Sequence, residues 1–169
     1  AGIDAGQPGE CDAVLLAYGI CGTSALGLVA RHVPLVIPRA HDCITLYLGS
    51  RQRYQAEFDA HPGTYWYSMD YLEHNKPGSN AGLGAANLGV MQEMYEEYIQ
   101  KYGQDNADYL MEVMGEWGKH YDRAAFIDMG VGDASAFEQI ARDQAERRGW
   151  LFERKQGNRR LIELLVNGQ

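Results

Sequence analysis

The hydrophobic and polar positions of the chain follow the same order twice, once near each end. In the first half, the apolar run 13–17 precedes a glycine loop, and a second apolar run, 33–37, follows after a segment, 23–32, patterned as a short helix or helical turn. Short apolar runs rich in branched residues and closed by glycine or proline are typical of buried strands. Residues 12–43 are therefore predicted to form strand, glycine loop, helix and strand, which is a parallel crossover unit.

The same order returns in the last part of the chain. The expected elements are a strand at 124–128, a loop with Gly130 and Gly132, a helix ending at Gly149, a strand at 150–157 and a final helix at 158–168. Two such units in one chain predict an α/β fold. The expected architecture is a mostly parallel sheet or two facing Rossmann-like lobes, with a helical insertion between the units.

The segments between the two units are predicted to be mainly helical. Asp42 is expected to cap one helix, and Ser50 is expected to cap a second helix after a break at Gly49. The predicted organisation is a single α/β domain over residues 1–169, with a first lobe at about 11–75, a glycine-rich linker at about 76–89, a helical pair at 90–121 and a second α/β unit at 122–169.

Composition and charge narrow the classes of partner. The chain has 169 residues, of which 46% are hydrophobic and 22% charged, and this is ordinary for a folded globular protein. A net charge of -8 disfavours nucleic acid and anionic membranes as partners. No apolar run approaches the ~20 residues of a membrane span, and three cysteines are too few for a secreted disulfide framework. We predict a cytoplasmic protein, with a homo-oligomer left open.

Two loops of the first unit carry side chains suited to chemistry. In parallel α/β sheets, functional groups gather past the carboxyl ends of the strands. Cys21 follows the first predicted strand, and His41 and Cys43 follow the second. If these strands are neighbours, the three side chains converge, and thiolate and imidazole are preferred ligands of zinc, iron, nickel and copper. The sequence predicts a metal site with three protein ligands and one open position.

The same residues allow two other interpretations, because the spacing lacks the paired cysteines of a known zinc signature. The cysteines can be small buried residues in a metal-free ligand-binding protein. Alternatively, Cys43 at a helix N-terminus is the nucleophile of a transferase, with His41 as its base and Asp42 beside it. Tyr18 and Arg39 of the same loops are candidate cofactor-binding residues.

The second unit offers one further candidate for ligand binding. Asp128 stands at the end of a predicted strand, in FIDMGVGD, where glycines permit close approach but the carboxylates of Asp128 and Asp133 repel phosphate. Asp133 is expected to cap the next helix. The aromatic segment 65–67 is expected either to wall a pocket for a flat or apolar ligand or to pack between lobes.

Five segments carry a resemblance to a known family. In the order LLAYGICG, PLVIPRAHDCITLYLGS, HPGTYWY, EEYIQKYGQDNADYLMEVMGEW and FIDMGVGD, they resemble the bacterial and archaeal family catalogued as domain of unknown function 1638. The resemblance covers nearly the whole chain and includes Cys21, His41 and Cys43. Family members begin with a further strand that carries a cysteine, and they end with another strand. The resemblance therefore implies a chain trimmed at both termini, with the missing cysteine as a fourth ligand.

The resemblance also implies a metabolic setting, because genes of this family are often found beside those for corrinoid-dependent methyl transfer. We therefore expect a metal-binding protein that is an enzyme or an accessory protein of corrinoid or one-carbon metabolism. The expected cofactor is zinc, iron or nickel, with a corrinoid left open, and the expected partner is a small molecule or a corrinoid protein.

Overall fold

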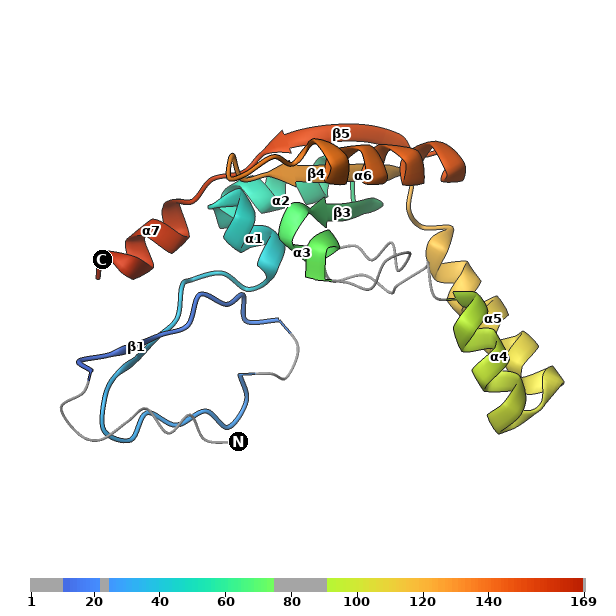
Figure 1. Ribbon diagram of the computed structural model, residues 1–169, viewed down its shortest axis with the longest axis horizontal. Helices are drawn as coiled ribbons and strands as arrows, with labels where there is room; N and C mark the ends of the chain where they lie inside the picture. Colours follow the sequence, from blue (N-terminus) through green and yellow to red (C-terminus); the bar gives the residue numbers. More distant parts are fainter. Residues whose placement is uncertain (1–10, 22–24, 75–90, 169) are drawn as a thin grey trace. The chain divides into compact units, whose positions relative to one another are not determined.

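A computed structural model describes residues 11–21, 25–74 and 91–168 (Figure 1). The chain divides into two compact units, one made of residues 1–56 with 157–169 and the other of residues 57–156. The glycine-rich linker predicted at about 76–89 lies outside the described residues. The single-domain organisation stays a prediction.

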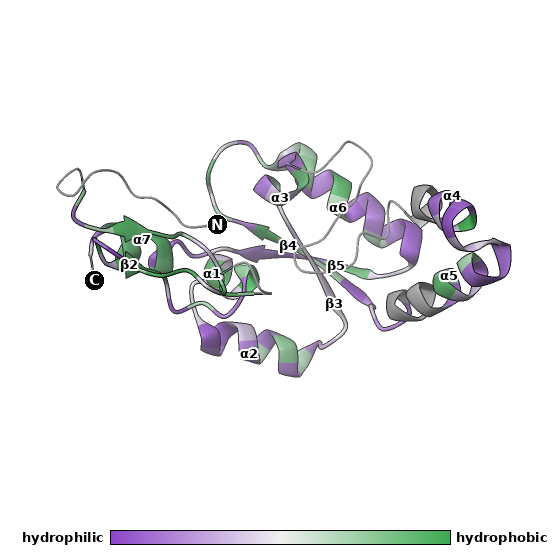
Figure 2. Cartoon of the chain, turned by 90° about the horizontal axis from the view of Figure 1, so that it is seen from below, coloured by the Kyte–Doolittle hydropathy of each residue, from purple (hydrophilic) through white to green (hydrophobic). Residues whose placement is uncertain are grey.

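The first unit contains a short parallel pair of strands. β1 (Val14–Leu15) pairs with β2 (Leu35–Val36), so the predicted neighbourhood of these strands is confirmed. The ladder continues past β1, because the Leu16 N–H donates to the Val36 carbonyl at 2.9 Å. Each strand is only two residues long and partly exposed, which differs from the buried strands expected over 13–17 and 33–37. β2 is coloured hydrophobic in Figure 2.

The prediction of a helix over 23–32 is wrong for residues 25–32, the part of this segment that the structure describes. Residues 25–27 form a turn, and residues 28–32 are not helical. Gly27 has a φ of 78°, in the left-handed region, which a right-handed helix does not use. The helical turn, the other form that the pattern allowed, is closer to what is found.

Two consecutive helices follow β2 as predicted. α1 (Cys43–Leu48) is capped by Asp42, whose carboxylate accepts the Thr45 N–H at 2.6 Å. Gly49 ends it with a φ of 72°, and Ser50 Oγ accepts the Arg53 N–H at 3.3 Å at the start of α2 (Arg51–Ala60). α1 is buried on more than one side, at Ile44, Thr45, Leu46 and Leu48. α7 (Arg160–Val166) completes this unit.

The second unit is built on a three-stranded parallel sheet with the order β3-β4-β5. Its strands are β3 (Thr64–Ser68), β4 (Arg123–Asp128) and β5 (Leu151–Gln156), which run side by side in Figure 1. β4 and β5 were predicted. β3 was not expected as a strand, and it lies within the first lobe predicted at 11–75 although it pairs with β4.

One face of this sheet packs on α6 (Ser135–Arg148). Ala141 and Ala145 are one turn apart on the helix and fully buried, and their small size lets the helix approach the sheet closely. The sheet contributes Tyr65, Tyr67, Ala124 and Phe126 to this core. The aromatic segment is therefore core on this face. Gly149 ends α6 in the left-handed conformation, as predicted.

The opposite face of the sheet holds a buried ion-pair network around Arg123. Only 2% of the Arg123 side chain is exposed. Its guanidinium donates to Thr64 Oγ1 at 2.9 Å, to Glu153 at 2.6 Å and to Glu57 at 3.1 Å. Lys155 Nζ lies 2.8 Å from Glu57 and 2.5 Å from Glu153, so the two cations balance the two carboxylates.

The remaining helices lie between β3 and β4 in the chain. They are α3 (Met69–His74), α4 (Met91–Tyr102) and α5 (Gln104–Gly118). The helical pair predicted over 90–121 is confirmed, with Gly103 at a φ of 81° between its members. Helices and parallel strands in both units confirm the α/β fold class.

Candidate functional site

The connections that follow β1 and β2 meet in the first unit, as the strand pairing predicts. The Ile20 N–H donates to the Ala40 carbonyl at 3.0 Å, which ties one connection to the other. Gly19 is buried against the peptide bond between Asp42 and Cys43. A Cβ on Gly19 would lie 2.3 Å from the Asp42 carbonyl carbon and 2.5 Å from the Cys43 nitrogen. Only glycine therefore fits this contact.

His41 is held by its neighbours at one ring nitrogen. Its Nδ1 is hydrogen-bonded to Thr45 Oγ1 at 3.0 Å and lies 3.1 Å from Asp42 Oδ2. The Tyr54 ring and the imidazole are nearly perpendicular, at 84°, with their centroids 4.9 Å apart. The His41 side chain is 44% exposed, and Nε2 is the nitrogen that these contacts leave for a ligand.

Cys21 and Cys43 are half-buried free thiols. Burial, and then the neighbouring Cys21 and Asp42, raise the pKa of the Cys43 thiol to about 11. Cys43 is therefore protonated at neutral pH, although it is the first residue of α1. A nucleophilic Cys43 stays a prediction, and it requires a ligand or partner that lowers this pKa.

The structure brings Cys21 near Cys43, but it does not bring the three predicted metal ligands into a coordination shell. No group of three or more His, Cys, Asp or Glu side chains in the described ranges is arranged to hold a metal ion. His41 Nδ1 is engaged by Asp42 and Thr45, so a shared ion requires His41 to turn toward the thiols. Metal binding by Cys21, His41 and Cys43 therefore stays a prediction.

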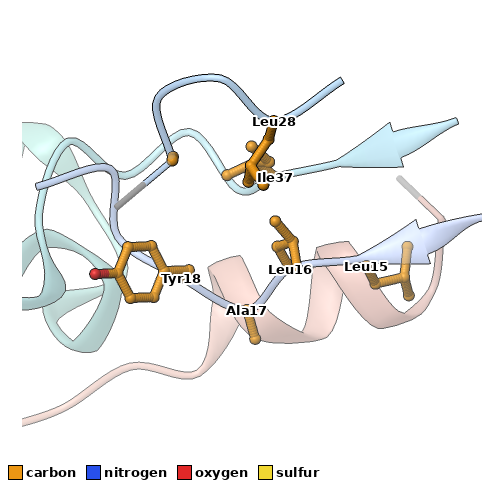
Figure 3. Close-up of a pocket in the computed structure, with 7 residues that line it drawn as sticks. Leu15, Leu16, Ala17, Tyr18, Leu28 and Ile37 are labelled. Carbon is orange, nitrogen blue, oxygen red and sulfur yellow. The ribbon is translucent and has the colours of Figure 1, made fainter. Parts of the chain in front are cut away.

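Tyr18 and Arg39 flank the same connections, and Tyr18 borders an apolar hollow. The hollow has a volume of about 400 Å³, and its lining is almost entirely apolar. Leu16, Leu28 and Ile37 lie close together in it, with the Tyr18 ring at one end (Figure 3). Arg39 is exposed. A volume of this size is in the range of small-ligand sites.

Asp128 lies in the second unit and is engaged in local contacts. Its carboxylate accepts the Gly130 N–H at 2.8 Å and pairs with Arg154. The Gly130 hydrogen bond and then Arg154 hold the pKa of Asp128 below its usual value. Asp133 accepts the Ser135 N–H at 3.0 Å at the start of α6, which is close to the capping role expected for it. Binding of a ligand by Asp128 stays a prediction.

Three residues of this region were not singled out as site residues from the sequence. Thr45 and Tyr54 orient the imidazole of His41, and Gly19 lets the two connections touch. A signal for Thr45 was present, because residues four apart on a helical turn face each other and His41 precedes Thr45 by four. The contact of Gly19 had no local signal.

In the part of the chain that the structure describes, the fold is α/β with two parallel sheets, and Cys21, His41 and Cys43 lie on the connections that follow one strand pair. The chain belongs to the family described as Protein of unknown function (DUF1638), which it matches over residues 2–166. Comparisons with curated proteins and with solved structures find no match. Across the described residues, no helix combines the length and apolar character that a membrane span requires.

Proposed function

We propose that this protein binds a soft or borderline transition metal ion, such as zinc, iron or nickel, through Cys21, Cys43 and His41. The bound ion has an open position for a small molecule, so the protein acts as a metal-dependent enzyme or as an accessory protein. Thiolate and imidazole are the donors that such ions prefer.

The contact between the two connections is the observation that carries this proposal. The hydrogen bond from Ile20 to Ala40 and the close approach of Gly19 bring together segments that bear Cys21 and Cys43, which are 22 positions apart. Two thiols that follow neighbouring strands supply two of the three proposed ligands. The remaining donor lies two residues before Cys43.

The position of His41 supports its role as the third ligand. Histidines that bind metals usually donate their second ring N–H to a carboxylate or carbonyl group, which fixes the tautomer. Asp42 Oδ2 lies 3.1 Å from His41 Nδ1 and offers such an acceptor. Nε2 is then the ligating nitrogen, after a rotation of the His41 side chain toward the thiols.

Metal content and metal affinity test the proposal directly. We expect purified protein to take up about one equivalent of Co²⁺ or Zn²⁺, with a thiolate-to-cobalt absorption band for Co²⁺. Cys43→Ser and Cys21→Ser should each weaken binding by about tenfold or more, because a thiolate ligand is lost. Cys11→Ser is the matched control, because Cys11 is exposed and outside the site. Equal metal content in wild type and Cys43→Ser would contradict the proposal.

The expected metabolic role, partner and location of the protein rest on the family resemblance and on the composition of the chain. A role in corrinoid or one-carbon metabolism, a corrinoid protein as partner and a cytoplasmic location are predictions that this proposal leaves in place. A homo-oligomer also stays open.

The apolar hollow beside Tyr18 supports a second candidate function, the metal-free binding of a small apolar ligand. We expect indole at about ten times its Kd to raise the melting temperature by about 3–6 °C. Leu28→Asp should abolish the shift, because Leu28 lines the hollow. Leu26→Asp should preserve it, because Leu26 is exposed and does not line the hollow. A shift that survives Leu28→Asp would argue against this candidate, and the shift should be independent of Cys43→Ser.

A further inference from the structure

A groove lined by tyrosines runs between α4 and α5, in a different unit from the thiol site. We call it the tyrosine groove, and it has a volume of about 600 Å³. It is lined by Tyr98, Tyr102, Asn106, Tyr109 and Leu110. This volume suits a small ligand.

Helical spacing explains why these side chains share one groove. Tyr98 and Tyr102 are four residues apart on α4, and Asn106 and Leu110 are four apart on α5, so each pair lies on one face of its helix. α4 and α5 pack against each other, and Ala107 of α5 is fully buried. Asn106 Nδ2 donates to the Tyr102 carbonyl at 2.8 Å, which connects the turn to the groove.

The groove presents aromatic faces to solvent. The rings of Tyr98 and Tyr102 are tilted by 51° with their centroids 6.0 Å apart. Tyr102 is 55% exposed and Tyr109 is 65% exposed. The face of an aromatic ring carries negative electrostatic potential, so exposed rings that converge on one hollow favour a cation above them.

The side chains around the groove carry a net negative charge, like the negative potential of the ring faces. Residues 91–118 contain seven acidic side chains and one basic one, for a net charge of -6 out of -8 for the whole chain. The basic residue, Lys101, is paired with Glu97. Asp105 and Glu112 are exposed, and they flank Tyr109 at helical spacings of four and three residues. This charge disfavours an anion, and it also disfavours a second copy of the same acidic surface.

We propose that the tyrosine groove binds a guanidinium group, whether it belongs to a small organic cation or to an arginine side chain. Guanidinium is planar, stacks on aromatic faces and bonds to carboxylates through two N–H groups, which matches rings edged by Asp105 and Glu112. The chain itself places guanidinium groups over rings: Arg142 lies 4.2 Å from the centroid of Phe152, and Arg148 lies 5.0 Å from that of Trp150.

Calorimetric titration of the full chain with N-acetyl-arginine amide tests this proposal. N-acetyl-citrulline amide is the matched probe, because it has a similar shape and an uncharged urea group. We expect binding of the arginine probe and about three- to tenfold weaker binding, or none, of the citrulline probe. A double variant, Tyr98→Leu with Tyr102→Leu, should bind the arginine probe more weakly by a similar factor. Tyr98→Phe keeps the ring face and should bind nearly as wild type does.

Acidic residues supply a second test that leaves the aromatic rings intact. The double variant Asp105→Asn with Glu112→Gln should bind the arginine probe more weakly, and this affinity should depend less on salt concentration. Glu96→Gln is the control, because Glu96 is two residues from Tyr98 and so points away from the groove. Circular dichroism checks that each variant keeps its helices. Equal affinity for both probes, or equal weakening by the Glu96 and Asp105 variants, would overturn the proposal.

The guanidinium group has two chemical sources, which the pentapeptide acetyl-Gly-Gly-Arg-Gly-Gly-amide separates. Equal affinity for the pentapeptide and the single arginine amide assigns the groove to a free small molecule. Tighter binding of the pentapeptide assigns it to an arginine side chain of a polypeptide. Both results uphold the guanidinium site, and the absence of binding by both probes would refute it.

Discussion

Arg123→Met is expected to lower the free energy of unfolding by about 1–3 kcal/mol, because Thr64, Glu57 and Glu153 lose the hydrogen bonds that the buried guanidinium donates. The Arg123 side chain is 2% exposed, and its guanidinium contacts Glu57, Glu153 and Thr64. Glu57 and Glu153 are partly exposed and keep Lys155 as a partner, so the loss should fall below the range of about 3–5 kcal/mol for breaking a fully buried pair. Urea denaturation measures the change.

Two further variants make this expectation specific to the buried network. Lys101→Gln removes an exposed ion pair with Glu97, and it should leave the unfolding free energy nearly unchanged. Adding Glu57→Gln to Arg123→Met should recover part of the loss, because it removes one of the stranded charges. If Arg123→Met is no more destabilising than Lys101→Gln, the network does not stabilise the fold in this way.

The sequence predicts the elements whose signals are local. Asp42, Gly49 and Ser50 mark the ends of α1 and α2 because a capping side chain and a left-handed glycine act within four residues of the helix end. β4 and β5 are equally readable, since each is a short apolar or alternating run next to a glycine. The meeting of the loops after β1 and β2 follows from the rule that parallel strands end at one edge of a sheet.

Elements that depend on distant partners could not be predicted in the same way. β3 has no alternation of polar and apolar residues, because both faces of its strand are buried, Tyr65 and Tyr67 on one and Trp66 on the other. Its partner strand begins 59 positions later. Arginine is usually a surface residue, so the sequence gives no sign that Arg123 is buried. Glu57 and Glu153, which are far away in the sequence, compensate its charge in the fold.

The orientation of the His41 side chain also could not be predicted from the sequence. The sequence places His41 two residues from Cys43, and either metal ligation or base catalysis would be consistent with that spacing. The structure turns Nδ1 toward Asp42 and Thr45, a choice set by the rotamer of His41 and by the buried hydroxyl of Thr45. Residue spacing alone does not determine a rotamer.

Gly19→Ala is expected to separate the two connections that form the thiol site. The new methyl group would lie 2.3 Å from the Asp42 carbonyl carbon, and backbone atoms cannot yield as a flexible side chain can. We expect a loss of about 1–3 kcal/mol in unfolding free energy, as for overpacking elsewhere. We also expect Cys21 and Cys43 to move apart. Bridging of the two thiols by dibromobimane, measured by fluorescence in a Cys11→Ser background, should therefore fall strongly.

Gly27→Ala is the control that separates local strain from loss of the contact. Gly27 is in the same unit and has a φ of 78°, but a Cβ there would meet nothing within 4 Å. Its substitution should cost about 1 kcal/mol through backbone conformation and leave thiol bridging unchanged. If Gly19→Ala bridges as well as Gly27→Ala, the close approach of Gly19 does not hold the thiols together. The proposed metal site would then lose the contact on which it rests, even if the protein still bound metal elsewhere.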